Sequence, residues 1–315
     1  MDAFVLYNVT VLVDEDVEDG TVLVNLANAT SDTTDDVPGN DEDTKDTKVA
    51  GSGFTLNVTK FYDANANGQF DGGEISLDGW KFSVDNTVYL TLIEIVMNSL
   101  QFTVTEHDPI ENNWQNTTSK IVDIDLDSAE DVDLEFGNVC VEGDGGGKTQ
   151  GFWSNRNGQI LYNAAGDSNE MLSELNLVEE NGDDFDPDNY ASFRNWLKDI
   201  NKNDNMTYKL SVQLSAMALN AYAGDVNGGT YLYAPELAPF ATEIESITGE
   251  EFTGFITVND LILVADSILA DDIDGIIDEK DSNFAFAEAV KDVLDSGNNN
   301  ESIFVSSTPC EFSFE

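Results

Sequence analysis

The sequence predicts a multidomain protein in which an antiparallel β-sandwich region is followed by a mainly α-helical domain. Apolar and polar side chains alternate over residues 54–62 and again over 77–84, with the period of two that is typical of strands. Beyond Asp186-Pro187, which marks a helix start, apolar residues recur at helical spacing. With 41% hydrophobic residues, the chain is too apolar for a disordered acidic tail, and it is long enough for two or three domains.

Residues 1–50 are expected to form part of a β-sandwich, followed by an acidic, turn-rich segment. Residues 3–13 and 20–30 are strongly β-prone, whereas 31–48 is rich in Asp and Thr. Residues 19–30 resemble the closing strands of a β-sandwich repeat that is common in surface proteins, and only this closing half is present. Half a sandwich exposes strand edges that need a partner. The missing strands either lie in a removed upstream region or come from another subunit by strand addition.

Residues 63–74, between the two alternating runs, have the ligand spacing of an EF-hand calcium loop. Counted from Asp63, oxygen-bearing side chains occupy positions 1, 3, 5, 9 and 12, and Gly68 occupies position 6. The five side chains belong to Asp63, Asn65, Asn67, Asp71 and Glu74, and Gln69 would offer its backbone carbonyl. Because both flanks are strands, we expect a calcium loop within a β-domain. The alternative is an Asx-rich surface turn.

Residues 51–140 resemble the B-repeat domains of serine-aspartate-repeat adhesins, which have a prealbumin-like or immunoglobulin-like fold. The resemblance is carried by residues 60–63, 67–68, 71, 74 and 77–80, and later by 102–106, 114–117 and 136–138. The segment 86–100 departs from it, because it lacks the hairpin that is usual there. The resemblance implies a rigid, calcium-stiffened spacer of surface proteins rather than an enzyme.

Three polar residues are expected on the apolar sides of three separate strands. Lys60 shares a strand face with Val58, and Glu106 and Asn138 each share one with apolar neighbours. Collagen-adhesin B-type domains, to which this region is similar, place Lys, Glu and Asn in this way to form an intramolecular isopeptide bond. That resemblance implies the nucleophile for Lys60, the proton shuttle for Glu106 and the amide for Asn138. A buried noncovalent Lys60–Glu106 pair is the alternative.

Residues 141–149 are rich in glycine and predict a flexible linker into a helical domain spanning 150–315. Helical spacing predicts helices over 190–200, 206–223, 258–269 and 284–294. The opening Gly151-Phe-Trp-Ser-Asn155 resembles a domain found beside B-repeats in secreted proteins.

Residues 254–266 resemble the second half of a dockerin calcium motif, without the acidic half that normally precedes it. Asp225 and Asn227 are candidates for a displaced first half. Asp225, Asn227, Thr257 and Asp260 would then share one ion. The alternative is an ordinary helix start with Thr257 as its N-cap.

The two cysteines, Cys140 and Cys310, bracket the second half of the chain. They either form a disulfide that ties the entrance of this region to its exit or remain buried free thiols. The resemblance to surface proteins favours the disulfide.

Composition excludes two classes of partner. The chain has 62 acidic and 13 basic residues, and its net charge of −49 repels nucleic acid phosphates and anionic lipids. No stretch approaches the roughly 18–20 apolar residues of a membrane span. The longest apolar run, 88–96, is interrupted and predicts a buried strand.

The sequence contains no serine or cysteine nucleophile motif and no glycine-rich phosphate loop, so it predicts no enzyme. We expect a calcium-dependent extracellular structural protein at the cell surface, which assembles with copies of itself into a filament or layer. The alternative is a surface-anchored adhesin or dockerin-like module that binds a glycan or a protein.

Overall fold

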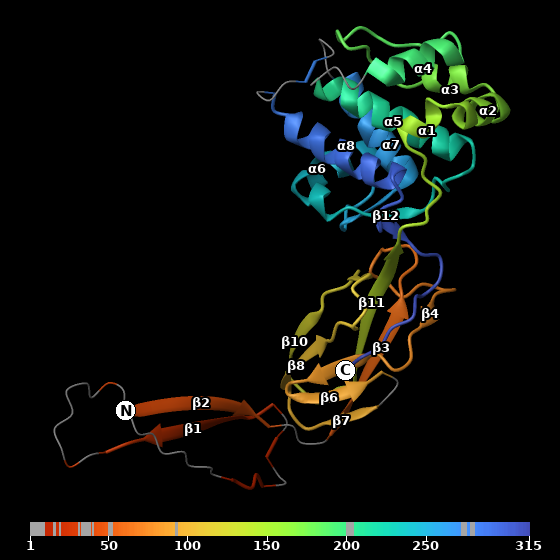
Figure 1. Ribbon diagram of the computed structural model, residues 1–315. Coiled ribbons are helices and arrows are strands. Elements are labelled where there is room, and N and C mark those ends of the chain that lie inside the picture. Colours follow the sequence, from red (N-terminus) through yellow and green to blue (C-terminus); the bar gives the residue numbers. More distant parts are fainter. Residues whose placement is uncertain are drawn as a thin grey trace.

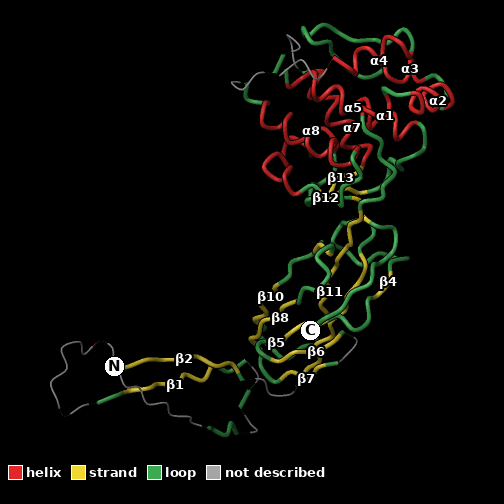
Figure 2. The backbone as a smooth tube through the Cα atoms, in the orientation of Figure 1, coloured by secondary structure: helices red, strands yellow, loops and turns green. Residues whose placement is uncertain are grey.

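The computed structural model describes residues 10–14, 17–18, 20–30, 32, 39, 41–49, 53–91, 94–199, 205–271, 276–277 and 281–315. Strands dominate the first half of the chain and helices the second half, as the sequence predicts (Figure 2). The β-rich region and the helical region lie end to end, and strand β11 runs from one toward the other (Figure 1).

Two sheets form the β-rich region. The first has the strand order β10–β8–β5–β6, made of Ile121–Asp125, Gln101–Glu106, Lys81–Val84 and Thr87–Leu90. The second is built on β3 (Phe54–Tyr62) and β11 (Val132–Glu142), with which β4 (Ile75–Ser76), β7 (Ile95–Met97) and β9 (Trp114–Asn116) pair. Strands β3 and β11 run parallel, whereas the sequence predicted an antiparallel sandwich. Both strands run toward the helical region, so they can pair only in this sense.

The core between these sheets follows the alternation of the strands. Phe54, Leu56 and Val58 of β3 are buried, and the residues between them are partly exposed. They pack in one cluster with residues of the other sheet, including Phe82 and Val104. Burial of such side chains contributes about 1.5–3 kcal/mol each, so this alternation fixes which face of β3 is internal.

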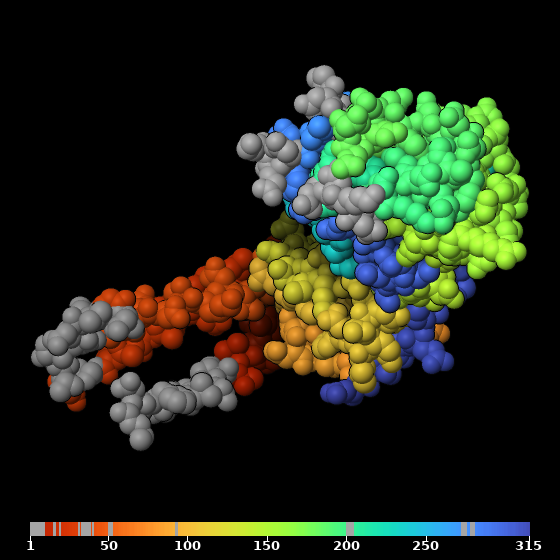
Figure 3. Space-filling view, turned by 45° about the horizontal axis from the view of Figure 1, so that its top comes forward, coloured from red at the N-terminus to blue at the C-terminus, as the bar shows by residue number. Residues whose placement is uncertain are grey.

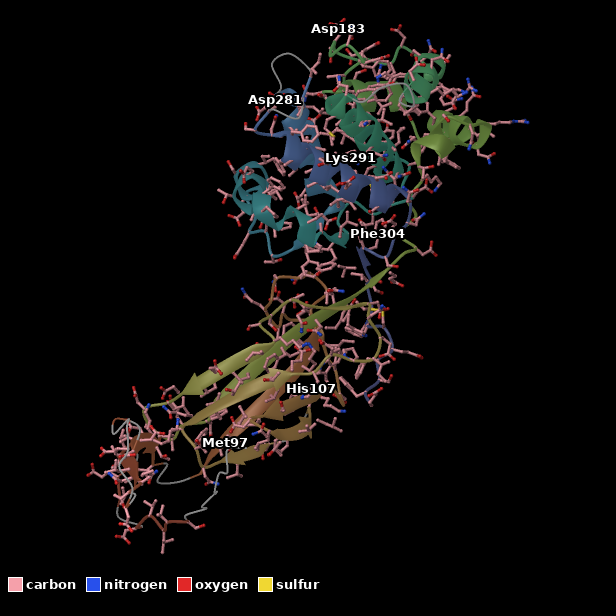
Figure 4. The ribbon with its side chains drawn as sticks, turned by 60° about the vertical axis from the view of Figure 1, so that its left-hand side comes forward. Met97, His107, Asp183, Asp281, Lys291 and Phe304 are labelled. Carbon is pink, nitrogen blue, oxygen red and sulfur yellow. A yellow bond between two sulfur atoms is a disulfide. The ribbon has the colours of Figure 1, made fainter. Side chains whose placement is uncertain are left out.

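Strand β11 extends beyond this core and carries the second sheet, which has eight strands among the described residues, into the helical region. Its end pairs with β14 (Phe304–Val305), which is followed in the sheet by β12 (Tyr231–Tyr233) and β13 (Phe255–Thr257). Residues 141 and 142 belong to β11, and the glycines that follow are packed, so the prediction of a flexible linker over 141–149 is wrong. A Cβ on Gly146 would lie 2.0 Å from the carbonyl oxygen of Asp225, and one on Gly145 would lie 2.4 Å from the ring of Phe304. Phe304, labelled in Figure 4, marks this junction.

The helical region surrounds one central helix. Helix α5 (Met206–Tyr222) is buried over most of its length and packs against α7 (Val258–Ala270) and α8 (Phe284–Asn298). The shorter helices are α1 (Gln150–Trp153), α2 (Arg156–Ala164), α3 (Ser168–Ser173), α4 (Tyr190–Asp199), α6 (Ala241–Thr248) and the 3-10 helix η3 (Pro235–Phe240). The four helices predicted from spacing correspond to α4, α5, α7 and α8.

A two-stranded hairpin projects from the β-rich region (Figure 3). It pairs β1 (Val22–Asn28) with β2 (Glu42–Lys48), so the end of the predicted turn-rich segment is a strand. Sequence patterning missed β2 because it contains no apolar residue. The predicted strand over 3–13 falls largely outside the described residues.

The apolar run 88–96 is divided between two strands on different sheets. Val88 and Leu90 of β6 are exposed, whereas Ile95 of β7 is buried against the core. The prediction of one buried strand here is therefore wrong.

Candidate functional site: a buried polar triad and an acidic loop

Three polar side chains meet inside the β-rich region. Lys60 lies on β3, Glu106 ends β8 and Asn138 lies on β11, and the three are only 1%, 2% and 2% exposed. The parallel register of β3 and β11 sets Phe136 opposite Lys60 and Asn138 opposite Tyr62. Because β8 belongs to the other sheet, the triad joins both sheets.

The Glu106 carboxylate connects the amine and the amide. The Lys60 Nζ atom lies 3.2 Å from Glu106 Oε1, and it also donates to the carbonyl oxygen of Phe136 at 3.0 Å. The Nδ2 group of Asn138 donates to the same Glu106 Oε1 at 2.9 Å. One carboxylate oxygen therefore contacts both groups that an isopeptide bond would join.

Asn116 on β9 completes the cluster, and the sequence interpretation did not assign it a role. Its Nδ2 group donates to Glu106 Oε2 at 2.9 Å and to Asn138 Oδ1 at 3.0 Å. These bonds fix the Asn138 amide with its nitrogen toward Glu106. The signal was present in the sequence, because Asn116 lies two residues after Trp114 and so shares its buried strand face.

Burial shifts the proton affinities of the pair toward the neutral forms. Desolvation lowers the pKa of Lys60 from 10.5 to about 8, although the negative charges of Glu106 and Asp63 oppose this. Desolvation raises the pKa of Glu106, against the charge and hydrogen bond of Lys60. The Trp80 ring, whose centroid lies 4.8 Å from Lys60 Nζ, is part of the apolar surroundings that exclude water from the amine. Burial therefore lowers the cost of the uncharged amine and of the carboxylic acid, relative to the same groups in water.

The predicted calcium loop follows β3 directly. Asp63 at its first position is fully buried, and its carboxylate accepts from the backbone N–H groups of Asn67 at 3.1 Å and Gly68 at 2.7 Å. Gly68 adopts a positive φ of 75°, which glycine tolerates without strain. The carboxylate of Glu74, at the last position, accepts from the N–H of Ala64 at 2.9 Å. It thereby ties the end of the loop to its beginning.

The remaining predicted ligands of the loop bond to one another. The Nδ2 groups of Asn65 and Asn67 donate to the same oxygen of Asp71, at 3.0 and 2.7 Å, and they lower the pKa of Asp71. Glu74 accepts from the N–H of Asp71 at 3.0 Å, and burial raises the pKa of Glu74. Gln69 donates its N–H to Asn67 Oδ1 at 2.8 Å. Rotation of the two Asn amides would present oxygens where their nitrogens now lie.

The donor set of this loop is chemically suited to calcium, because it consists of carboxylates, amide oxygens and a carbonyl. In the described part of the chain, however, no three His, Cys, Asp or Glu side chains are grouped closely enough to hold a metal. Instead, the polar side chains of the loop form hydrogen bonds with one another and with the backbone of the loop.

The second predicted ion site is only partly brought together. The backbone N–H of Asn259 donates to the carbonyl of Gly228 at 2.8 Å, so the two sequence segments lie side by side. Asp225 instead forms an ion pair with Lys148, at 2.8 Å. Thr257 accepts from the N–H of Asp260 and caps α7, which is the alternative that the sequence left open. Sharing of an ion by Asp225, Asn227, Thr257 and Asp260 stays a prediction.

The predicted disulfide is present. Cys140 on β11 is bonded to Cys310, and the bridge spans a sequence separation of 170 residues. It therefore joins the exit of the helical region to the strand that enters it.

The chain matches no protein-family model and no curated protein. Among the helices in the described ranges, none has the length and apolar character needed to cross a bilayer.

Proposed function

We propose that this chain is an extracellular structural protein whose prealbumin-like sandwich is closed by a Lys60–Asn138 isopeptide bond and stiffened by calcium. The observation that carries the proposal is the position of Glu106 Oε1 between the Lys60 amine and the Asn138 amide in a dry core. The resemblance of residues 51–140 to B-repeat adhesin domains gives independent support. Such domains act as rigid spacers at cell surfaces.

The bond forms by amide exchange. Transfer of a proton from the Lys60 ammonium to Glu106 gives the amine and the acid. The amine attacks Cγ of Asn138, a new C–N bond forms, and the old Cγ–Nδ2 bond breaks. Glu106 passes protons from the attacking nitrogen to the departing nitrogen, which leaves as ammonia. No oxidant or reductant is needed.

Calcium would act at the loop that extends β3. Asp63, Asp71 and Glu74 supply the negative charge, while Asn65, Asn67 and the carbonyl of Gln69 supply neutral oxygens. Binding would replace the internal hydrogen bonds of the loop and relieve part of the repulsion within a chain of net charge −49.

Self-assembly is supported by the hairpin of β1 and β2. Val22, Val24 and Leu26 of β1 are 47%, 63% and 59% exposed, and β1 pairs with β2 alone in the described part of the chain. An isolated two-stranded hairpin has marginal stability in water. A strand from a second copy would satisfy the free edge of β1 and cover this apolar face.

A second candidate function is a binding module, as in adhesins and dockerin-like proteins. It is favoured by a cleft of about 510 Å³ between the predicted calcium loop, residues 63–74, and the helical region. The cleft is lined by amides of the loop and by aromatic residues such as Tyr231 and Phe252. Sites for small ligands often lie between domains in this way.

Intact-mass spectrometry tests the covalent proposal. After reduction of the Cys140–Cys310 disulfide, the native chain is expected to be lighter than its sequence mass by about 17 Da, whereas Asn138→Ala and Lys60→Met variants should match their sequence masses. An unshifted native mass would exclude the isopeptide bond and leave a noncovalent triad.

Electron microscopy with millimolar calcium and with chelator tests the assembly proposal separately. Filaments or sheets that disappear on chelation support a calcium-assembled subunit. Single particles in both conditions would contradict it and favour the binding module.

A further inference from the structure

The last ten residues of the chain run back from the helical region along the β-rich region, where the C-terminus lies (Figure 1). We call residues 306–315 the C-terminal strap. It begins at Ser306, whose N–H donates to the carbonyl of Cys140 at 2.9 Å and whose carbonyl accepts from the Tyr62 hydroxyl at 2.6 Å. The disulfide at Cys310 then fixes its middle to β11.

Polar contacts fasten the outer half of the C-terminal strap. The N–H and hydroxyl of Ser313 both donate to the carboxylate of Glu111 at 2.7 Å, and the carbonyl of Ser313 accepts from the N–H of Ile110 at 2.9 Å. Lys81 Nζ donates to the carbonyl of Glu315 at 2.6 Å. Residues 313–315 are therefore held in one register on the β-rich region.

In this register, two phenylalanine rings pack against Trp80, which lies next to the triad. The ring centroids of Phe312 and Phe314 lie 4.7 and 5.5 Å from that of Trp80, and Phe312 also lies 5.8 Å from Trp114. Trp80 is fully buried and is itself the aromatic neighbour of Lys60 Nζ. A continuous aromatic layer thus runs from the C-terminal strap to the Lys60 amine.

We propose that the C-terminal strap completes the dry site of the triad, and that Phe312 and Phe314 are positioning residues that act on Lys60 through Trp80. The inference rests on the proposed isopeptide function and extends it. The sandwich would acquire its cross-link only after the helical region has folded and returned the C-terminal strap. The isopeptide bond would therefore form only in chains in which both the β-rich region and the helical region have folded.

The physical reason is the solvation of Lys60. Without the two rings, water reaches Trp80 and the neighbouring ammonium, whose charged form is then stabilised. Each unit by which the Lys60 pKa rises toward its ordinary value reduces the neutral amine near pH 7 about tenfold. The rate of bond formation should fall by the same factor.

The test compares a Phe312→Ala/Phe314→Ala variant with a Phe312→Leu/Phe314→Leu variant, which keeps apolar cover. After reduction of the disulfide, all molecules of the native and Leu proteins are expected to be about 17 Da lighter than their sequence masses, but only a fraction of the Ala protein. Incubation of the Ala protein at about pH 10 should restore the bond, because deprotonation of Lys60 replaces desolvation. Loss of folding would not be rescued in this way. A fully cross-linked Ala protein would overturn the inference.

Acetylation of surface amines, followed by peptide mass spectrometry at Lys60, separates this inference from the proposed function. If the native mass is unshifted, the covalent proposal fails, but the C-terminal strap is still tested. Lys60 should then be labelled at least tenfold faster in the Ala variant than in the native and Leu proteins. Equal labelling rates in all three would overturn the role of the C-terminal strap.

Discussion

Replacement of Glu106 by alanine tests the energetics of the triad most directly. We consider it in an Asn138→Ala background, in which no isopeptide bond can form. The Lys60 ammonium would keep the Phe136 carbonyl at 3.0 Å and the Trp80 ring, but it would lose its only acidic partner among the ion pairs described. Removal of one member of a buried pair costs about 3–5 kcal/mol, because the remaining charge is left without compensation.

A second variant separates loss of the pair from loss of packing. Lys60→Met/Glu106→Leu in the same background removes both charges and keeps most of the volume, so it should recover most of that free energy. Urea unfolding followed by circular dichroism gives the free energy for each protein. The matched surface control is Lys120→Ala, which removes the exposed pair with Asp108 and should change stability by about 1 kcal/mol or less.

The reasoning would be refuted by a Glu106→Ala cost as small as that of the surface control. It would also be refuted if the Lys60→Met/Glu106→Leu protein were as unstable as Glu106→Ala. The first result would mean that water reaches Lys60 in the folded state, and the second would mean that lost packing, rather than the unpaired charge, causes the instability.

Four further predictions concern pH, calcium and the disulfide. Burial lowers the pKa of Lys60 to about 8, so between about pH 8 and 10.5 the unfolded Asn138→Ala chain binds more protons than the folded chain. The stability of this chain, relative to the same chain with Lys60→Met, should therefore rise across this window. A stability difference in urea melts that does not change with pH would contradict this prediction. Glu74→Gln removes the bidentate position of the loop and should weaken calcium binding about tenfold or more in calorimetric titration, whereas equal affinities would place calcium elsewhere. Because burial raises the pKa of Glu74, calcium affinity of the native loop should also fall on acidification at a higher pH than for an ordinary glutamate. Reduction of the Cys140–Cys310 bridge, which closes a span of 170 residues, should lower the free energy of unfolding by about 5 kcal/mol; identical urea midpoints before and after reduction would contradict that estimate.

The triad could be predicted from sequence because local alternation controls burial. Once Phe54, Leu56 and Val58 face the core, Lys60 must face it too, and the same argument applies to Glu106 and Asn138. Their mutual distances could not be predicted, because these depend on the parallel register of β3 and β11 and on the packing of the two sheets.

Other features escaped sequence reasoning because their cause is tertiary. The glycines of the segment after β11 suggest flexibility, but Gly145 and Gly146 are needed for close approach to Phe304 and Asp225. The hairpin between β5 and β6 turns at Asp85, which adopts a φ of 51° that is uncommon outside glycine. Phe312 and Phe314 alternate like strand residues, but nothing local shows that Trp80 is their partner.

The disulfide determines which part of this chain would bear a mechanical load. If residues 53 and 315 are pulled apart, tension passes directly from Cys140 to Cys310, and residues 141–309 lie in a closed covalent loop that carries none. A Lys60–Asn138 bond would exclude residues 61–137 in the same way. Only three short stretches of backbone, 53–60, 138–140 and 310–315, would then be stretched. The helical region would then carry no tension while the rest of the chain is under load.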